Sequence, residues 1–246
     1  MDEIKSLARG LRILRVIADE VQSISVTALA EQLGVDKATG SRRVRALVNH
    51  GFVEKASDGR RYQLGPELVK LSRVIIDLLQ WRETAKYYLE QLVELTGEYS
   101  HLAIYSNGQA LYIDQAESDN TLQVNVSIGH MAPLHCTALG KVLLAFGNHP
   151  IPYKLEGRTA NTITSQSALK NELERVRKQG YAIDDEEYDR GVRCIAAPII
   201  DCRNRVVASL GISGPAVRIG LENIDALAQK VLDISRELSD RLKFEI

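Results

Sequence analysis

Basic side chains gather in one short stretch of the sequence, and their chemistry suits binding to a polyanion. Between residues 37 and 61 there are seven lysines and arginines against two acidic residues. Residues 1–65 carry 11 basic and 8 acidic residues, whereas the rest of the chain carries 20 and 24. A local basic patch in a chain of net charge −1 indicates a nucleic-acid contact, and the alternative is a solvated charged face.

A second dense cluster is acidic. Four consecutive acids occupy residues 184–187. Such carboxylates could ligate a metal, act as a catalytic pair or form an exposed turn, and the exposed turn is the commonest meaning of a charge run. A hydrolase or lyase built from Asp184, Cys194 and His135 is the alternative function that these residue types leave open. The five histidines and three cysteines show no metal-ligand spacing, so we expect no metal and no cofactor.

The basic stretch falls on a helix-turn-helix pattern that is followed by a hairpin. Apolar residues recur at helical spacing in three segments, residues 4–18, 25–33 and 37–49. The first of these helices has Ile4, Leu7, Leu11, Leu14 and Ile17 as its apolar face. Gly34 stands at the turn before the third helix, where a positive φ is wanted. Asp58-Gly59 predicts the tight turn of a basic wing over residues 52–64.

The third helix is the one expected to enter the major groove of DNA, because its N-terminal half carries polar and basic side chains. The candidate DNA contacts are Lys37, Thr39, Ser41, Arg42 and Arg43 in this helix and Arg60 and Arg61 in the wing. Gly40 is unusual there, because glycine costs ~1 kcal/mol in a helix interior. Either the backbone approaches DNA closely at this residue or the cost is simply tolerated.

Gly65-Pro66 predicts a domain boundary. We expect a winged helix-turn-helix DNA-binding domain over residues 1–65, a linker helix over 66–80 and a second domain over 81–246. The linker has an apolar face too wide for a solvated helix, which predicts self-association through residues such as Leu71 and Leu78.

The second domain mixes strand and helix patterns, which predicts an α+β fold. Asn107-Gly108 marks a hairpin, residues 122–128 alternate like a strand, and the last 25 residues form an amphipathic helix. No apolar run reaches the ~18 residues that span a bilayer, and the first residues lack the apolar core of a signal peptide. We therefore expect a cytoplasmic protein with no membrane segment.

Taken together, these residues resemble the IclR family of transcriptional regulators over nearly the whole chain. The N-terminal carriers of the likeness are SLARGLRIL, AEQLGV, the helix that contains Arg42, HGFVEK and YQLGPELVKL. The C-terminal carriers are PLHCTALGKVLLA, GYAIDDEEYDRGVRCIAAPIID and SLGISGP. The resemblance implies a winged helix-turn-helix joined by a helix to a GAF-like mixed α/β effector-binding domain. It also implies homodimers or homotetramers on palindromic double-stranded DNA operators, and a regulator rather than an enzyme.

The resemblance further implies a site for a small organic, often aromatic, acid in the second domain. Backbone N–H groups of Ala138 and Leu139 would lie near the effector carboxylate, as suits an anion at a helix N-terminus. The other pocket positions implied are Asp184, Val192, Cys194, Gly211 and Ser213. Some relatives have serine where this chain has Gly211, so we expect a lost hydroxyl donor and a roomier corner. That corner would favour an effector larger than the smallest acids.

Overall fold

The computed structural model describes residues 4–20, 23–78, 81–121, 124 and 126–245. The side chains of residues 74–78, 244 and 245 are outside this description. The chain divides into two compact units, Met1–Gln80 and Trp81–Ile246. Residues 79 and 80 of the predicted linker helix lie outside the described residues.

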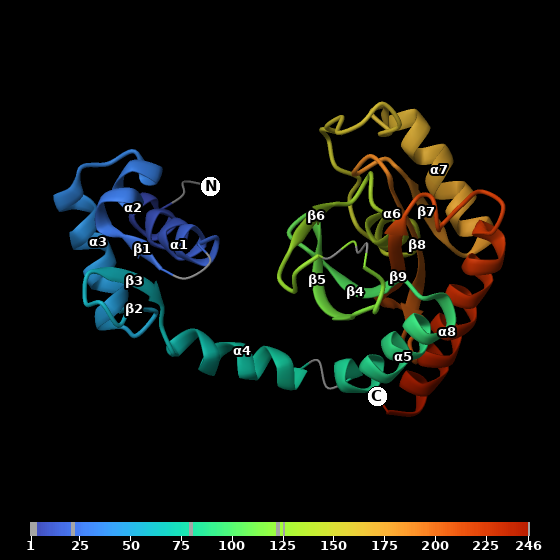
Figure 1. Cartoon of the computed structure of the whole chain (residues 1–246), viewed down its shortest axis with the longest axis horizontal. Coiled ribbons are helices and arrows are strands. Elements are labelled where there is room, and N and C mark those ends of the chain that lie inside the picture. The colour runs from blue at the N-terminus through green and yellow to red at the C-terminus, as the bar shows by residue number, and fades with distance from the viewer. Residues whose placement is uncertain (1–3, 21–22, 79–80, 122–123, 125, 246) are drawn as a thin grey trace. The chain divides into compact units, whose positions relative to one another are not determined.

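The first unit combines three helices and a small sheet, which are followed by a final helix (Figure 1). Its elements are α1 (Lys5–Ala18), β1 (Ile24–Ser25), α2 (Val26–Leu33), α3 (Lys37–Asn49), β2 (Val53–Lys55), β3 (Arg61–Leu64) and α4 (Glu67–Leu78). The strands form an antiparallel sheet in the order β1-β3-β2. A single apolar core joins helices and sheet, formed by Ile13, Ile17, Ile24, Leu29, Val44 and Val53.

Capping side chains and a glycine fix the ends of α2 and α3. The Ser25 hydroxyl accepts a hydrogen bond from the Ala28 N–H at 3.2 Å, which caps α2. Gly34 ends α2 with φ +63°, a left-handed conformation that glycine adopts without strain. Asp36 caps α3 by accepting a hydrogen bond from the Thr39 N–H at 2.9 Å. The helix-turn-helix with a β wing is therefore confirmed.

The apolar face of α1 divides into two parts. Ile13 and Ile17 are buried in the core of the unit. Ile4, Leu7 and Leu11 are 68%, 60% and 50% exposed. Periodicity alone located one broad apolar face, but only its C-terminal part meets the unit's own core.

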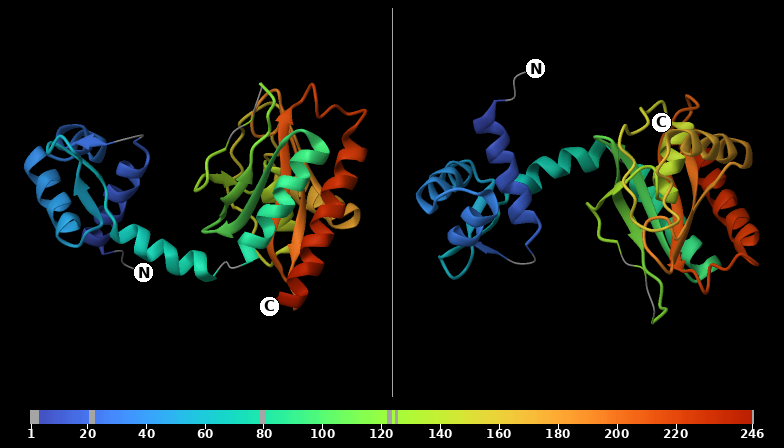
Figure 2. Two further views of the ribbon diagram at one scale, coloured as in Figure 1. Left: turned by 60° about the horizontal axis from the view of Figure 1, so that its bottom comes forward. Right: turned by 90° about the horizontal axis from the view of Figure 1, so that it is seen from above.

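The second unit is a six-stranded antiparallel sheet with helices on both faces (Figure 2). Its elements are α5 (Trp81–Thr96), β4 (Tyr99–Ser106), β5 (Gln109–Ala116), β6 (Met131–Pro133), α6 (Ala138–Phe146), α7 (Gln166–Gln179), β7 (Ala182–Asp185), β8 (Val192–Ile200), β9 (Val206–Pro215) and α8 (Ile224–Glu245). The strand order is β6-β5-β4-β9-β8-β7. Helices α5 and α8 pack on one face, and α6, backed by α7, packs on the other. The α+β prediction is confirmed.

Two local expectations differ from the structure. Residues 124 and 126–128 of the predicted strand at 122–128 are not in a strand, and residues 122, 123 and 125 lie outside the described residues. The edge strand beside β5 is instead β6, which sequence alternation did not reveal because it is only three residues long. None of the described helices is long and apolar enough to cross a membrane.

Candidate functional site

The predicted DNA-contacting residues lie on α3 and on the wing of the first unit. Lys37, Arg42, Arg60 and Arg61 are exposed, whereas Thr39, Ser41 and Arg43 are half-buried. The Thr39 hydroxyl donates a hydrogen bond to Asp36 Oδ2 at 2.6 Å. Thr39 therefore helps to close the N-terminal cap of α3, and a contact with DNA would compete with that hydrogen bond.

The wing turn places two arginines side by side at its tip. Asp58 Oδ1 accepts hydrogen bonds from the backbone N–H groups of Arg60 and Arg61, at 2.8 and 2.9 Å. These hydrogen bonds lower the pKa of Asp58, and Gly59 supplies the positive φ of +66° that the turn requires. The backbone of the turn is thus fixed while both guanidinium groups extend from it into solvent.

Gly40 has a structural explanation that the sequence did not suggest. The residue is buried, and a Cβ at this position would lie 3.2 Å from the Cβ of Ala30 on α2. Glycine therefore allows α2 and α3 to pack closely at the turn, which sets the position of the DNA-facing side of α3. Neither close approach to DNA nor simple tolerance is needed to account for it.

In the second unit, three predicted effector residues form one row across the sheet. Asp184 on β7 pairs with Cys194 on β8, and Cys194 pairs with Ser213 on β9. Directly paired residues of an antiparallel sheet point to the same face. Burial and the nearby Asp184 raise the pKa of Cys194 above its ordinary value, and the Ser213 hydroxyl opposes this rise.

The remaining predicted effector residues border this row. Val192 on β8 and Gly211 on β9 are two positions from Cys194 and Ser213 and so share their face. Ala138 and Leu139 form the first turn of α6, which packs over β8 and β9. The structure therefore brings all of these predicted residues to one side of the sheet.

The start of α6 offers backbone donors. Thr137 caps the helix by accepting a hydrogen bond from the Gly140 N–H at 3.2 Å. The N–H groups of Ala138 and Leu139 have no acceptor within α6, because the first turn of any helix lacks one. The Leu139 side chain is buried in the core cluster between α6 and the sheet, so its backbone, rather than its side chain, is available to a ligand.

Asp184 is buried and holds the loop that follows β7. Its Oδ1 atom accepts hydrogen bonds from the backbone N–H groups of Glu187 and Tyr188, at 2.8 and 3.2 Å. Burial raises the pKa of Asp184 to about 7, with a further rise from the negative charge of Glu187. The expectation of an exposed acidic turn is wrong for Asp184 and Glu187, which are 2% and 6% exposed.

A buried ion pair that the sequence reasoning missed joins α6 to α7 and to the loop after β7. Lys141 is fully buried, and its Nζ atom contacts Glu187 Oε1 at 2.5 Å and Glu172 Oε1 at 3.2 Å. Burial raises the pKa of Glu187, and the Lys141 ammonium opposes that rise. A signal existed: Lys141 is the one charged residue in the apolar segment of residues 137–146, and a buried lysine needs partners.

The prediction that Gly211 leaves room in the site is wrong. A Cβ at Gly211 would collide with the Ile195 carbonyl oxygen and would lie 2.8 Å from the Cβ of Ala196. Strand β8 therefore approaches β9 too closely for any side chain at this position. Gly211 therefore gives no extra space to a larger effector.

The residues of the enzyme alternative are not arranged for nucleophilic catalysis. His135 Nε2 donates a hydrogen bond to the Glu156 carbonyl oxygen at 3.0 Å, so this nitrogen cannot act as a base. Burial raises the pKa of Cys136 to about 12, and it raises that of Cys194 as well, so neither thiol ionises readily. Across the part of the chain that the structure describes, no group of three potential metal ligands occurs.

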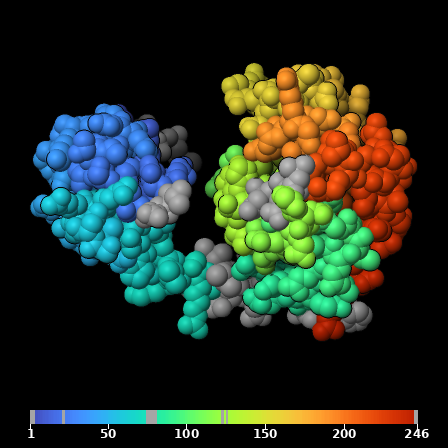
Figure 3. Space-filling view, viewed as in Figure 1, coloured from blue at the N-terminus to red at the C-terminus, as the bar shows by residue number. Residues whose placement is uncertain are grey.

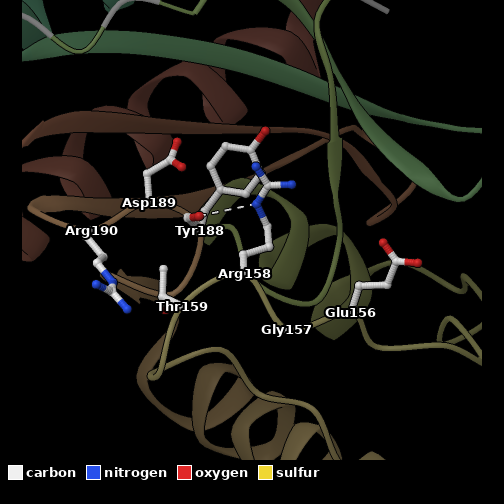
Figure 4. Close-up of a pocket in the computed structure, with 7 residues that line it drawn as sticks. All are labelled: Glu156, Gly157, Arg158, Thr159, Tyr188, Asp189 and Arg190. Carbon is white, nitrogen blue, oxygen red and sulfur yellow. Dashed lines mark hydrogen bonds between the residues drawn. The ribbon is translucent and has the colours of Figure 1, made fainter.

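A polar cleft of about 380 Å³ opens at the surface beside the loop after β7 (Figure 4). It is lined by Glu156, Gly157, Arg158, Thr159, Tyr188, Asp189 and Arg190 and includes none of the predicted effector residues. The Arg158 guanidinium lies 4.1 Å above the Tyr188 ring, and its Nε donates to the Tyr188 carbonyl oxygen at 3.2 Å. Because the Tyr188 N–H also binds Asp184, this residue connects the cleft with the buried row.

Hydrogen bonds tie the two loops that form this cleft to each other. The hydroxyl of Thr159 donates to the Glu186 carbonyl oxygen at 2.7 Å, and that of Thr162 donates to the Glu187 carbonyl oxygen at 2.6 Å. The loops are in contact at the surface of the second unit, where Figure 3 shows them in yellow and orange. No sequence motif indicated this pairing, because the loops are 25 or more residues apart.

Comparisons with known proteins point to the same family for both units. The family described as "Bacterial transcriptional regulator IclR C-terminal" matches residues 74–240, and "IclR helix-turn-helix domain" matches residues 6–57. The HTH-type transcriptional regulator XynR of Escherichia coli (strain K12) is 33% identical, covering 97% of this chain and 98% of its own length.

Solved structures show the same fold. The crystal structure of the Thermotoga maritima IclR has a TM-score of 0.76 at 30% identity and covers 98% of this chain and 100% of its own. An IclR homolog from Microbacterium hydrocarbonoxydans, complexed with 4-hydroxybenzoate, has a TM-score of 0.81 at 21% identity, covering 97% and 99%.

The matched proteins are regulators of transcription, which decides against the hydrolase or lyase alternative. The two family matches also occur in the order that the sequence motifs predicted. The chain belongs to the IclR family of bacterial transcriptional regulators.

Proposed function

We propose that this regulator binds a palindromic DNA operator as a homodimer or homotetramer and that a small organic acid controls its occupancy of the operator. Residues 1–65 would bind DNA, residues 66–80 would link and associate, and residues 81–246 would bind the acid. The observation that carries the proposal is the gathering of the predicted effector residues on one face of the sheet, under the first turn of α6.

The DNA part of the proposal rests on exposure and charge. Lys37 and Arg42 project from α3, and Arg60 and Arg61 project from the wing. A helix in the major groove with an adjacent basic hairpin on phosphate or in the minor groove is a familiar division of labour among DNA-binding proteins. One such unit reads a short half-site, so two copies are needed for useful specificity.

The acid part rests on the surroundings of α6. Free backbone N–H groups at Ala138 and Leu139 suit a carboxylate, and the helix dipole adds to the attraction. Asp184 would repel an anion if ionised, but with a pKa of about 7 it can take up a proton at little cost. The solved homolog bound to 4-hydroxybenzoate holds a carboxylic acid, so aromatic acids are the first candidates.

The association part rests on exposed apolar surface in the first unit. Ile4, Leu7 and Leu11 form an exposed stripe on α1, and Val69 and Leu71 on α4 are 69% and 48% exposed. An apolar cleft of about 490 Å³ lies at the start of α4, lined by Glu54, Leu64, Gly65, Pro66, Leu68, Val69 and Ser72. We propose that a second copy of the chain covers these surfaces. The side chain of Leu78, also predicted to take part, lies outside the described residues.

The test of the acid-binding function is a thermal-shift series with matched pairs of carboxylic acids and their methyl esters. An acid that binds only the folded state, present at a concentration of 100 times its Kd, raises the free energy of unfolding by about 2.7 kcal/mol. For a domain of this size that corresponds to a rise of about 5–10 °C in Tm. The ester lacks the anion and should give little shift. Equal shifts by acid and ester, or no shift by any acid, would contradict the proposal.

A further inference from the structure

A fully buried and a half-buried polar side chain lie on the sheet face of the candidate effector site, and each has buried hydrogen-bonding atoms without a partner among the described residues. His101 on β4 pairs with Gly211 on β9 and, on its other side, with Gln115 on β5. Paired residues share a face, so His101 and Gln115 point to the same side as Gly211. Ser213 is two residues from Gly211 along β9, which makes it a diagonal neighbour of His101 at roughly 7–8 Å.

His101 is fully buried, yet neither ring nitrogen has a hydrogen-bond partner among the described residues. The same is true of Gln115 Oε1. The His101 ring lies against two other rings, with centroid distances of 6.1 Å to Tyr99 and 5.5 Å to Tyr112. Buried polar atoms are nearly always paired in native proteins, so two adjacent residues with unpaired atoms point to a missing partner.

The charge state of His101 limits what that partner is. Burial lowers the pKa of His101 to about 4, so the ring is neutral near pH 7 and offers one N–H donor and one acceptor. A neutral ring gives a second carboxylate no ionic attraction. A hydroxyl fits better, because it accepts from the imidazole N–H and donates to Gln115 Oε1. Cross-strand Cβ atoms lie about 4.5–5.5 Å apart, so one oxygen can reach both side chains.

The pair lies in the row of the sheet that the start of α6 covers. From Gly211 this row continues to Ala196 on β8. Ala196 packs in one core cluster with Ala138, Leu139 and Tyr112, whose ring contacts His101. The start of α6 therefore belongs to the same core cluster as Tyr112, whose ring contacts His101.

We propose that His101 and Gln115 read a hydroxyl group of the effector, so that the effector is a hydroxy acid. The inference rests on the proposed function, because it assigns the carboxylate of the same molecule to the start of α6. Sites built to hydrogen-bond a ligand hydroxyl reject the analogue that lacks it, because their polar atoms are then left unpaired. Discrimination for the hydroxyl thus belongs to these two side chains.

The experiment is calorimetric titration of the full chain with acids that differ by one hydroxyl, 4-hydroxybenzoate against benzoate and 3-hydroxybutyrate against butyrate. The variants are His101→Phe and Gln115→Leu. The matched control is His149→Phe, a half-buried ring that stacks on Tyr105 at 3.7 Å. In the wild type, the hydroxylated member of at least one pair should bind about tenfold tighter. His101→Phe should reduce this ratio to below about threefold without weakening the other member, and His149→Phe should keep it.

The melting temperature of the unliganded variants gives a second readout. His101→Phe removes two unpaired buried nitrogens, so its Tm should equal or exceed that of the wild type. If His101→Phe does not fold, a water or another internal partner satisfies the ring, and the inference is overturned unless Gln115→Leu abolishes the preference for the hydroxyl. If acids bind the wild type with no preference for the hydroxylated member, or if that preference survives both substitutions, the inference is overturned while the proposed acid-binding function stands. If no acid of the panel binds the wild type, the proposed function fails with it.

Discussion

Asp184→Asn should remove a pH dependence from the stability of the second unit. Asp184 has a pKa of about 7 in the folded chain, against an ordinary value of 3.8 that applies when the chain is unfolded. Between these values the folded state keeps a proton that the unfolded state has lost. Stability therefore falls as pH rises, by about 1.4 kcal/mol per pH unit. Above pH 7 both states are ionised, and the contribution of this group stops changing.

The size of the effect follows from the shift. From 3.8 to about 7 the loss amounts to about 4 kcal/mol, and the part between pH 5 and pH 7 is about 2.7 kcal/mol. The asparagine carboxamide oxygen can accept the same two hydrogen bonds from Glu187 and Tyr188 without titrating. Glu187 also has a raised pKa and is present in both proteins, so the difference between the two slopes reports Asp184 together with its coupling to Glu187.

The assay is urea unfolding at pH 5 and pH 8, followed through the fluorescence of Trp81. This is the only tryptophan in the chain, and it is buried at the start of α5, so it reports on the second unit. The difference in unfolding free energy between the two pH values should be about 2.7 kcal/mol smaller in Asp184→Asn than in the wild type. Asp189→Asn, which changes an exposed acid of the loop that follows β7, should behave as the wild type. An unchanged slope in Asp184→Asn would refute the reasoning.

Three further predictions concern DNA, association and thiols. Arg42→Ala with Arg43→Ala should weaken operator binding and lower the slope of log Kd against log salt by about 1 for each lost phosphate contact. Arg236→Ala, at an exposed position of α8, should change neither, and anisotropy titrations that are equal for the double variant and the wild type would count against α3 as the reading helix. Leu7→Glu on the exposed stripe of α1 should give monomers in sedimentation, whereas Tyr153→Glu, at a fully exposed residue, should not. If Leu7→Glu leaves the oligomer unchanged, the interface lies elsewhere. Iodoacetamide at pH 8 should label exposed Cys202 well before Cys136 or Cys194, because burial raises the pKa values of those two thiols. Mass spectrometry that shows all three cysteines labelled at the same rate would contradict this.

Local signals in the first unit predicted its elements well, because caps and turns depend on residues close in sequence. Gly34 after α2 and Asp58-Gly59 in the wing act only on the few residues beside them. The role of Gly40 and the exposure of Leu7 were not accessible in the same way. Each depends on which face of a helix meets another helix or another chain, and periodicity reports only that an apolar face exists.

In the second unit, motif likeness selected residues that share one face of the sheet, but it did not reveal the electrostatics of the candidate site. Asp184 is buried on the paired strand β7, and Glu187 is buried beside Lys141, although a run of four acids is typical of an exposed turn. Gly211 was expected to create space, and the close approach of β8 shows the opposite. The unpaired nitrogens of His101 become visible only when every neighbour across the sheet is in place.

The central claim is that acid binding in the second unit and operator binding in the first are coupled. The direct measurement is the Kd of the full chain for a duplex selected from a random library, by anisotropy, with and without a saturating acid found by thermal shift. The account predicts a two-fold symmetric duplex and a change in Kd of about tenfold, within the usual 5–150-fold range. Thermodynamic linkage then requires the duplex to change the Kd for the acid by the same factor. An operator Kd that stays the same while the acid is bound would contradict the claim.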